Sequence, residues 1–309
     1  MVELAIDLLG ADTPEEELCR GALDALEANA DLRLHLFGHA SVLAPLVSAS
    51  PAAARAVIVG CAEAITNYDN AMEAYTRAGA SLVRAMNSAR EGETAGVITC
   101  GSTGAVLVCA IMLLGKRRGE RPALAVELKN AAGDPLLLLD CGANIDCRAE
   151  LLVTFAHMGD AYMKGIGYAS PRISLLSNGS EDTKGCETVK AANALLRREP
   201  LHFLGNIEPT DALRGQTDVI VCDGFHGNIL LKAIEGVAKT VIGQIKELTV
   251  GDAIADEALA QVYRWYDYNT QGGAALLGVN RPVMKGYGAA GGEAVCHMIE
   301  RAYQIARPK

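Results

Sequence analysis

Residues 219–239 read VIVCDGFHGNILLKAIEGVAK, and this stretch decides the fold class. The apolar, β-branched run Val219–Cys222 is typical of a buried strand, and a helical pattern resumes at about Asn228. Gly224 and Gly227 permit tight backbone turns between the two. A strand that passes through a polar turn into a helix is typical of α/β proteins. The turn favours anion binding at the helix start, and it is equally a common strand-to-helix connection.

Short apolar runs of the same kind recur along the chain, and most are separated by helix-length stretches rich in alanine and leucine. Besides residues 219–222, they are residues 2–7, 32–37, 56–60, 96–100, 136–140, 172–176 and 201–204. Parallel strands need long crossover connections and read as continuous apolar runs. The alternation therefore predicts a mostly parallel sheet covered by helices on both faces. Because no linker interrupts it, we expect one α/β domain over residues 1–309, with 237–270 as a helical excursion outside the sheet.

The composition excludes several classes of protein. The chain has 309 residues, of which 50% are hydrophobic, and this is enough for a sizeable core. A net charge of -9 and a pI near 5.2 argue against nucleic-acid binding and against a strongly anionic membrane partner. The nine cysteines form no C-x-x-C pair and no signal peptide is present, so we expect a reduced, cytoplasmic protein. The longest apolar run, Ala105–Leu114, predicts a buried helix because it is too short to span a bilayer.

Polar, glycine-rich loops follow five of the predicted strands. They cover residues 7–12, 99–104, 140–146, 178–184 and 223–228. Ligands of open α/β sheets bind at the carboxyl ends of the strands. We therefore expect these loops to line a shared polar pocket.

Lys184 is the most informative cation in these loops, because it lies in a predicted turn before Gly185 and its compact ammonium suits a phosphate group. Three neutral amides lie near strand ends or glycine turns: Asn144, Asn206 and Asn228. An amide can bind phosphate oxygens or a developing oxyanion without charge repulsion, and it can equally cap a helix.

A further anion-binding segment is predicted where Ser102 and Thr103 stand between Gly101 and Gly104, at a predicted helix start. Hydroxyls and backbone amides at a helix start both favour anions. Asp7 ends the first predicted strand and opens the first polar loop. These residues are candidates for substrate binding.

The sequence gives little support for a metal site or for a nucleotide-binding site. The acidic side chains of the loops offer ligands for Mg²⁺, but no spacing specifies a metal, so we expect none. No predicted strand is followed by G-x-G-x-x-G with the acidic residue further on, and G-x-x-x-x-G-K-[ST] is absent from the sequence, so no nucleotide cofactor is expected. A covalent route through Cys100, Cys141 or Cys222 is conceivable, but buried, inert thiols are the favoured interpretation. For His226, which lies in a predicted loop, a surface or packing role is favoured over catalysis.

Seven motifs, in order along nearly the whole chain, resemble those of PlsX-type phosphate acyltransferases. They are Thr99-Cys-Gly-Ser-Thr-Gly-Ala105, Arg121-Pro-Ala-Leu-Ala125, Leu139-Asp-Cys-Gly-Ala-Asn-Ile-Asp146, Glu181-Asp-Thr-Lys-Gly185, Gly205-Asn-Ile-Glu208, Asp223-Gly-Phe-His-Gly-Asn228 and Gly272-Gly-Ala-Ala-Leu-Leu-Gly278. Each motif is weak by itself, and their common order makes the resemblance specific.

The resemblance implies a three-layer α/β/α fold similar to isopropylmalate dehydrogenases and phosphotransacetylases, in a homodimer. It also implies conversion of acyl-acyl carrier protein and inorganic phosphate into acyl-phosphate and free carrier, in fatty acid and phospholipid synthesis. A membrane glycerol-3-phosphate acyltransferase would use the product. The family's catalytic lysine and asparagine match Lys184 and Asn228. Phosphate and substrate are expected to bind Asp7, Gly101, Ser102, Thr103, Gly104, Asn144, Asp146, Asn206, Glu208, Asp223, Gly224 and Gly227.

The chain departs from the family pattern at several loops. Ala11 stands where the family usually has glycine, and Thr76 and Ala78 stand where an arginine and a lysine are expected, with Arg77 between them. Thr210 replaces an arginine, Ser102 an asparagine, and Tyr287-Gly-Ala289 a His-Gly-Ser. These changes keep open a weakly active or noncatalytic paralogue that binds the acyl carrier. A phosphotransacetylase-like enzyme that uses acyl-coenzyme A is a further alternative.

Two surfaces are expected to meet partners. The family's membrane-contacting hairpin corresponds to residues 237–267, whose net charge of -2 opposes anionic lipid. Dimer packing is therefore predicted there in preference to membrane attachment, which we expect to be weak. The densest basic cluster is predicted to dock the acidic acyl carrier protein, and it comprises Lys116, Arg117, Arg118 and Arg121.

Overall fold

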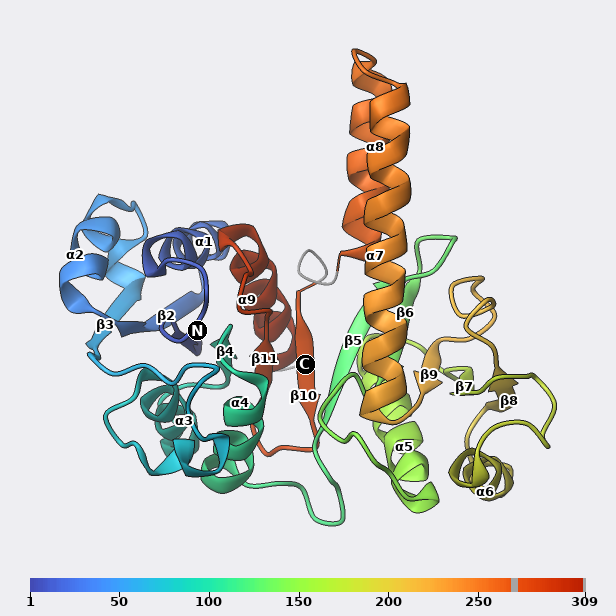
Figure 1. Cartoon of the computed structure of the whole chain (residues 1–309). Coiled ribbons are helices and arrows are strands. Elements are labelled where there is room, and N and C mark those ends of the chain that lie inside the picture. The colour runs from blue at the N-terminus through green and yellow to red at the C-terminus, as the bar shows by residue number, and fades with distance from the viewer. Residues whose placement is uncertain (268–271, 308–309) are drawn as a thin grey trace. The chain divides into compact units, whose positions relative to one another are not determined.

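The computed structural model describes residues 1–267 and 272–307, and these form two compact units (Figure 1). Unit 1 consists of residues 1–122 and 272–307, and unit 2 consists of residues 123–267. Each unit contains strands of a mostly parallel sheet with helices packed against them. The α/β class predicted from the sequence is confirmed. Whether the two units act as a single domain stays a prediction.

Unit 1 orders its strands β3-β2-β1-β4-β11-β10, and only β10 runs antiparallel to its neighbour β11. The strands are β1 (Val2–Asp7), β2 (Leu32–Gly38), β3 (Ala56–Gly60), β4 (Val97–Thr99), β10 (Ala274–Leu277) and β11 (Val283–Lys285). The helices are α1 (Glu15–Ala28), α2 (Ala40–Ala49), α3 (Ser81–Glu91), α4 (Thr103–Cys109) and α9 (Gly292–Ala306). In Figure 1, α1 and α9 lie on one side of these strands and α3 and α4 on the other.

Unit 2 orders its strands β5-β6-β9-β7-β8, in which β6, β9, β7 and β8 are parallel and β5 is antiparallel to β6. The strands are β5 (Ala123–Lys129), β6 (Pro135–Leu139), β7 (Ile173–Leu176), β8 (Phe203–Ile207) and β9 (Val219–Val221). Helix α5 (Ala149–Gly165) connects β6 to β7, and α6 (Glu187–Leu196) connects β7 to β8. Both crossovers advance in the same direction, so both helices cover the same face of these strands.

Helices α7 (Gly224–Leu248) and α8 (Ala253–Tyr266) form a hairpin that extends from unit 2 (Figure 1). This pair confirms the helical character predicted for residues 237–267, whereas residues 268–270 of the predicted excursion lie outside the described residues. Large apolar side chains are exposed along the hairpin, among them Val237, Val241, Leu248 and Ile254. None of the described helices combines the length and the apolar character that a bilayer crossing requires.

The eight predicted strands all occur, two of them with the predicted bounds and the others with ends that move by at most three residues. The sequence analysis missed β5, β10 and β11, because β5 begins directly after a proline and carries charged residues, and the other two are only four and three residues long. The buried helix predicted at residues 105–114 is confirmed as α4 followed by a π-helical turn, Ala110–Leu114. Helix α7 begins at Gly224, four residues before the predicted start, because the Asp223 side chain caps it.

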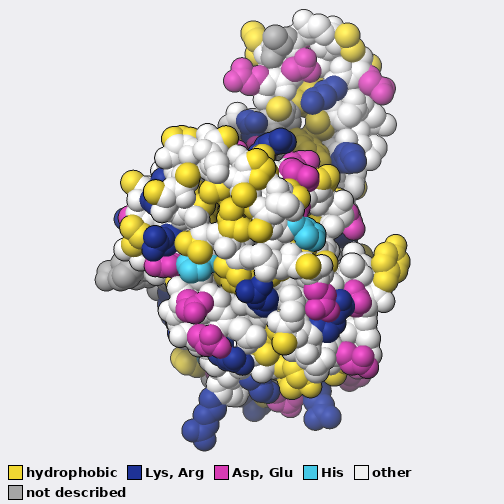
Figure 2. Space-filling view, turned by 90° about the vertical axis from the view of Figure 1, so that its left-hand side faces the viewer, with side chains coloured by type: hydrophobic (Ala, Val, Ile, Leu, Met, Phe, Trp, Pro, Cys, Tyr) yellow, Lys and Arg dark blue, Asp and Glu magenta, His cyan; other side chains and the backbone are white. Residues whose placement is uncertain are grey.

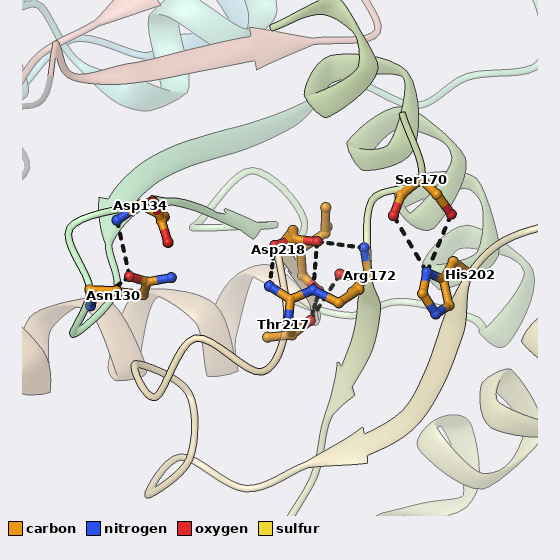
Figure 3. A network of polar contacts seen from close by, with 9 residues as sticks. Asn130, Asp134, Ser170, Arg172, His202, Thr217 and Asp218 are labelled. Atoms are coloured by element: carbon orange, nitrogen blue, oxygen red, sulfur yellow. Dashed lines mark hydrogen bonds and ion pairs between the residues drawn. The ribbon is translucent and has the colours of Figure 1, made fainter. Parts of the chain in front are cut away.

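A network of polar contacts joins the residues that precede β7 and β9 in unit 2, at the amino-terminal ends of these strands (Figure 3). The Arg172 guanidinium donates to both carboxylate oxygens of Asp218, from Nη2 at 2.6 Å and from Nε at 3.0 Å, and the Arg172 backbone amide donates to the same group at 2.7 Å. Burial opposes ionisation of Asp218, but the hydrogen bonds from Arg172 outweigh it and lower the pKa of the carboxyl. This pair fixes the register at the strand ends remote from the polar loops.

We expect Arg172→Ala to lower the free energy of unfolding by about 2 kcal/mol, because it leaves the nearly buried Asp218 carboxylate without its cation. The pKa of Asp218 is lowered on folding, so this contribution is present above the unfolded pKa and is lost as the pH falls through the folded pKa. Urea unfolding at pH 7 and pH 3 measures both effects. Asp134→Asn, at an exposed carboxyl nearby, is the matched control, and equal stability of the two variants at pH 7 would refute the assignment.

Candidate active site

Three of the five polar loops meet at one edge of unit 2. Strands β6, β9 and β7 are adjacent and parallel, so the loops that follow them lie at the same edge. The loops after β6 and β7 carry Asn144 and Lys184, and Asn228 lies in the first turns of α7, which follows β9. Strand β8 is also parallel and contributes Asn206 and Glu208 to this edge. The loops after β1 and β4 share the corresponding edge of unit 1, and convergence of all five loops on one pocket stays a prediction.

The loop after β6 is organised by the buried carboxylate of Asp140. This group accepts hydrogen bonds from the backbone amides of Leu124, Gly142, Ala143 and Asn144 at 2.7–3.2 Å, and from Nδ2 of Asn144 at 2.8 Å. Burial raises the pKa of Asp140, and the hydrogen bonds from Asn144 and the backbone partly offset the rise. The structure thus gives Asn144, a predicted phosphate ligand, a definite role in shaping the loop. Asp146, by contrast, is exposed at the loop's end.

The two glycines of the opening stretch allow α7 to approach this loop closely. A Cβ atom on Gly227 would lie 1.9 Å from the carbonyl oxygen of Asp140, and one on Gly224 would lie 2.9 Å from that of Asn144. No side chain larger than hydrogen fits at either position without moving the backbone. Packing therefore accounts for both glycines, and their contact with phosphate stays a prediction.

The start of α7 has fewer open amide donors than the sequence suggests. The Gly224 amide donates to the Asn144 carbonyl at 2.7 Å, and the His226 amide donates to the Asp223 carboxylate at 2.8 Å. The His226 ring contacts the same carboxylate through Nδ1 at 2.8 Å. Asp223 is therefore the helix cap, and His226 is its partner at an exposed position. Asn228, one turn into the helix, is exposed.

Lys184 lies in the loop between β7 and α6, and its side chain is exposed. Within the described residues, the Lys184 ammonium forms no ion pair or hydrogen bond. The adjacent Asn206 amide is already engaged, since Nδ2 donates to the Glu181 carbonyl at 2.8 Å and Oδ1 accepts from Asn193 at 2.9 Å. Asn206 thus holds the lysine loop in place. Glu208, at the end of β8, is half-buried.

At the edge of unit 1, Asp7 forms a buried cluster. Its carboxylate accepts from Ser81 Oγ at 2.6 Å, from Thr99 Oγ1 at 2.7 Å and from the Leu9 amide at 3.3 Å. Burial raises the pKa of Asp7 to about 6, against these three hydrogen bonds. Thr99 Oγ1 also accepts from the Gly101 amide at 3.0 Å, so the cluster fixes the start of the loop after β4.

The rest of that loop leads directly into α4. Ser102 and Thr103 are half-buried and Gly104 is exposed, and the Ser102 carbonyl accepts the first helical hydrogen bond, from Val106 at 2.9 Å. The three residues therefore stand at a helix start, as predicted. Their binding of an anion stays a prediction. The sequence analysis missed Ser81, which lies at the start of α3, and the buried Lys285, which ends the unpredicted strand β11 at the same edge.

Two departures from the family pattern have structural explanations. The left-handed backbone of the first loop falls on Gly10, with φ of 80°, so Ala11 occupies an ordinary conformation. The same loop is bonded to the loop around Tyr287, since the Asp12 amide donates to the Gly288 carbonyl at 2.7 Å. Arg77 donates to Glu63 at 2.5 Å and to Asp69 at 2.8 Å, so its guanidinium is paired with two carboxylates of the protein.

The three strand-end cysteines are poor nucleophiles. Burial raises the pKa of Cys100 to about 12, and burial likewise raises the pKa of Cys141 and of Cys222 far above the ordinary range for a thiol. The thiolate that an acyl-cysteine route requires is therefore strongly disfavoured. Within residues 1–267 and 272–307, no group of three or more His, Cys, Asp or Glu side chains is arranged to hold a metal ion.

The basic cluster of Lys116, Arg117, Arg118 and Arg121 is exposed in unit 1. Its backbone is anchored, because the Arg117 amide donates to the Gly278 carbonyl and the Asn280 amide donates to the Gly115 carbonyl, at 2.9 and 3.2 Å. On the face drawn in Figure 2, by contrast, basic and acidic side chains are interspersed and no extended basic surface is visible. The four residues thus form a local concentration of positive charge in a chain whose net charge is -9.

Comparison with known proteins places the chain in a family. The model of the family described as "Fatty acid synthesis protein" matches residues 2–309. The chain belongs to this family. It is 38% identical to a protein named phosphate acyltransferase from Geobacillus thermodenitrificans (strain NG80-2), over 98% of this chain and 95% of the relative. A phosphate acyltransferase from Thermobifida fusca (strain YX) is also 38% identical, over 98% of this chain and 87% of the relative. The resemblance drawn from the seven motifs is confirmed.

Solved structures share the fold of this family member. A branched-chain phosphotransacylase from Enterococcus faecalis V583 superposes with a TM-score of 0.65 over 100% of both chains, at 16% sequence identity. A phosphotransacetylase from Streptococcus pyogenes gives a TM-score of 0.65 over 98% of this chain and 94% of that one, at 19% identity. At these identities the likeness establishes the architecture alone, and it agrees with the fold predicted from the sequence.

The raised pKa of Asp7 predicts a pH dependence of stability. Protonated Asp7 favours the folded state, so its contribution is present below the ordinary pKa of 3.8 and is lost as the pH rises through about 6. The loss amounts to about 3 kcal/mol, from roughly 1.4 kcal/mol per pKa unit. Asp7→Asn cannot lose a proton, and we expect its free energy of unfolding to gain by that amount relative to wild type between pH 4 and pH 7. Parallel profiles in urea unfolding would contradict the assignment.

Proposed function

We propose that the protein is a phosphate acyltransferase that transfers the acyl group of acyl-acyl carrier protein to inorganic phosphate, releasing acyl-phosphate and free carrier. Relatives that are 38% identical over almost the whole chain bear the name phosphate acyltransferase. One structural observation carries the assignment of the site: Lys184 and Asn228 follow adjacent parallel strands, β7 and β9, and therefore stand at the same edge of unit 2.

The proposed reaction needs no enzyme nucleophile. Phosphate binds beside the Lys184 ammonium, whose exposed charge is open to an anion. A phosphate oxygen attacks the thioester carbon, and the Asn228 amide stabilises the negative charge that develops on the carbonyl oxygen. The carbon–sulfur bond then breaks, and the carrier thiol departs with the proton that hydrogen phosphate loses. The inert thiols of Cys141 and Cys222, at the same edge, agree with a direct transfer.

The acyl donor distinguishes this proposal from two others. An enzyme of the phosphotransacetylase type would prefer acyl-coenzyme A, whereas a noncatalytic partner would bind the carrier without turnover. The anchored basic cluster favours the carrier protein, because an acidic partner needs a local positive surface on a chain with a net charge of -9. A membrane glycerol-3-phosphate acyltransferase is the proposed consumer of the product.

We also propose that the protein is a homodimer through the α7–α8 hairpin. Exposed apolar side chains in such number along two helices are typical of a surface that another protein covers. The charge of -2 over residues 237–267 disfavours a strong attachment to anionic lipid.

We expect Lys184→Ala and Asn228→Ala each to reduce acyl-phosphate formation by a factor of about 10²–10³, because each removes a charge or donor from the reacting atoms. The assay combines long-chain acyl carrier with phosphate and detects acyl-phosphate, and both variants should unfold at the wild-type temperature. Lys190→Ala, at an exposed lysine on α6, and Thr240→Ala, on α7, are the controls and should keep the wild-type rate. Full activity in either site variant would reject its assignment.

The basic cluster is tested by charge reversal. Arg117→Glu combined with Arg118→Glu should raise the KM for acyl carrier about ten-fold at physiological salt and leave the KM for phosphate unchanged, because only the carrier carries an extended acidic surface. Arg20→Glu combined with Arg198→Glu makes the same change of net charge at exposed positions elsewhere. An equal effect of the two pairs would show that total charge acts rather than docking at this cluster.

A further inference from the structure

The loop that carries Lys184 is fixed from two neighbouring elements. On α6, Asn193 is 2% exposed, and its Nδ2 donates to Asp182 Oδ1 at 3.2 Å and to Asn206 Oδ1 at 2.9 Å. Arg197, one turn further along, forms an ion pair with Asp182. On β8, Asn206 in turn holds the Glu181 carbonyl. Glu181 is therefore tied to β8 through its backbone carbonyl, and Asp182 is tied to α6 through its side chain.

The final turn of the loop sets the direction in which Lys184 leaves the backbone. The Lys184 amide donates to the Glu181 carbonyl at 3.0 Å, and the Gly185 amide donates to Oδ1 of Asn178 at 2.8 Å. Gly185 has φ of 94°, a left-handed conformation that glycine adopts without strain. The backbone on both sides of Lys184 is thus restrained within the loop itself.

Gly179 provides the space that the Lys184 side chain occupies. A Cβ atom at Gly179 would lie 2.6 Å from Cγ and 3.1 Å from Cδ of Lys184, so the aliphatic part of the lysine lies directly against the glycine. The three nearest atoms also include Oε2 of Glu181, at 3.0 Å, which is the end of a flexible side chain. Gly179 does not have a left-handed φ, so its backbone accepts alanine without strain. Alanine at this position therefore acts mainly on Lys184.

We propose that Gly179 is a positioning residue for Lys184. The missing side chain lets the lysine stem lie flat against the restrained loop, and this contact directs the ammonium toward the edge that Lys184 shares with Asn228. The inference rests on the proposed function, because the direction of the ammonium matters to the rate only if Lys184 binds the reacting phosphate. A misplacement of about 1 Å can cost a rate factor of about 10², so a single methyl group at residue 179 is a sensitive probe.

A double-mutant cycle tests the proposal, using wild type, Gly179→Ala, Lys184→Ala and the double variant. We expect Gly179→Ala to lower kcat/KM for phosphate at least ten-fold in the wild-type background. It should have no further effect in Lys184→Ala, which lacks the Cγ and Cδ atoms that the new methyl group displaces. A purely structural role for Gly179 would reduce activity and stability in both backgrounds. Gly165→Ala, where an added Cβ meets no atom within 4 Å, is the matched control.

A crystal structure of the Gly179→Ala protein gives a readout that does not depend on turnover. The Lys184 Nζ should move by more than about 1 Å relative to wild type. An unmoved Nζ, or unchanged kinetics in Gly179→Ala while Lys184→Ala shows its expected loss of activity, would overturn the inference and leave the proposed function standing. Full activity in Lys184→Ala would instead reject the proposed role of the lysine itself.

Discussion

The parallel pairing of β7 with β9 is the constraint on which the candidate site depends. Lys184 and Asn228 are separated by more than forty residues, and each follows one of these two strands. Parallel neighbours end at the same edge of a sheet, so backbone hydrogen bonding alone brings the two loops together. The Arg172–Asp218 pair secures the opposite ends of the same strands. A stabilising ion pair and the proposed catalytic residues thus lie at opposite ends of the same two strands.

Many polar residues at this edge bind other parts of the protein, and this arrangement leaves few groups for a substrate. The Asp140 carboxylate accepts hydrogen bonds from amides of its own loop, and Asp223 caps α7. Asn206 donates to the Glu181 carbonyl in the loop that carries Lys184. A flexible loop with the same residues would not keep an ammonium in one direction. In the proposed reaction, these residues supply the preorganisation by which an exposed lysine and an exposed amide would act on a bound oxyanion without reorganising at the moment of reaction.

The sequence was sufficient for the fold class, for eight strands and for the loops that carry the site. Long apolar runs such as residues 2–7 and 136–140 were recognisable because buried parallel strands tolerate little else. The short strand β11 was not, since three residues show no periodicity. The sequence also could not show which polar residues of the loops bind a ligand and which bind the protein itself. An asparagine that binds a ligand and one that binds a backbone carbonyl look alike in a sequence. Asn206, which was predicted to bind substrate, instead donates to the Glu181 carbonyl. Nothing in the sequence distinguished Gly179 from the other glycines of the polar loops.

The most direct test of the central claim is a crystal structure of the protein with bound phosphate. A single phosphate within hydrogen-bond distance of both Lys184 Nζ and Asn228 Nδ2 is the result that this account predicts. Phosphate bound elsewhere, with the ammonium and the amide directed to opposite surfaces, would contradict it.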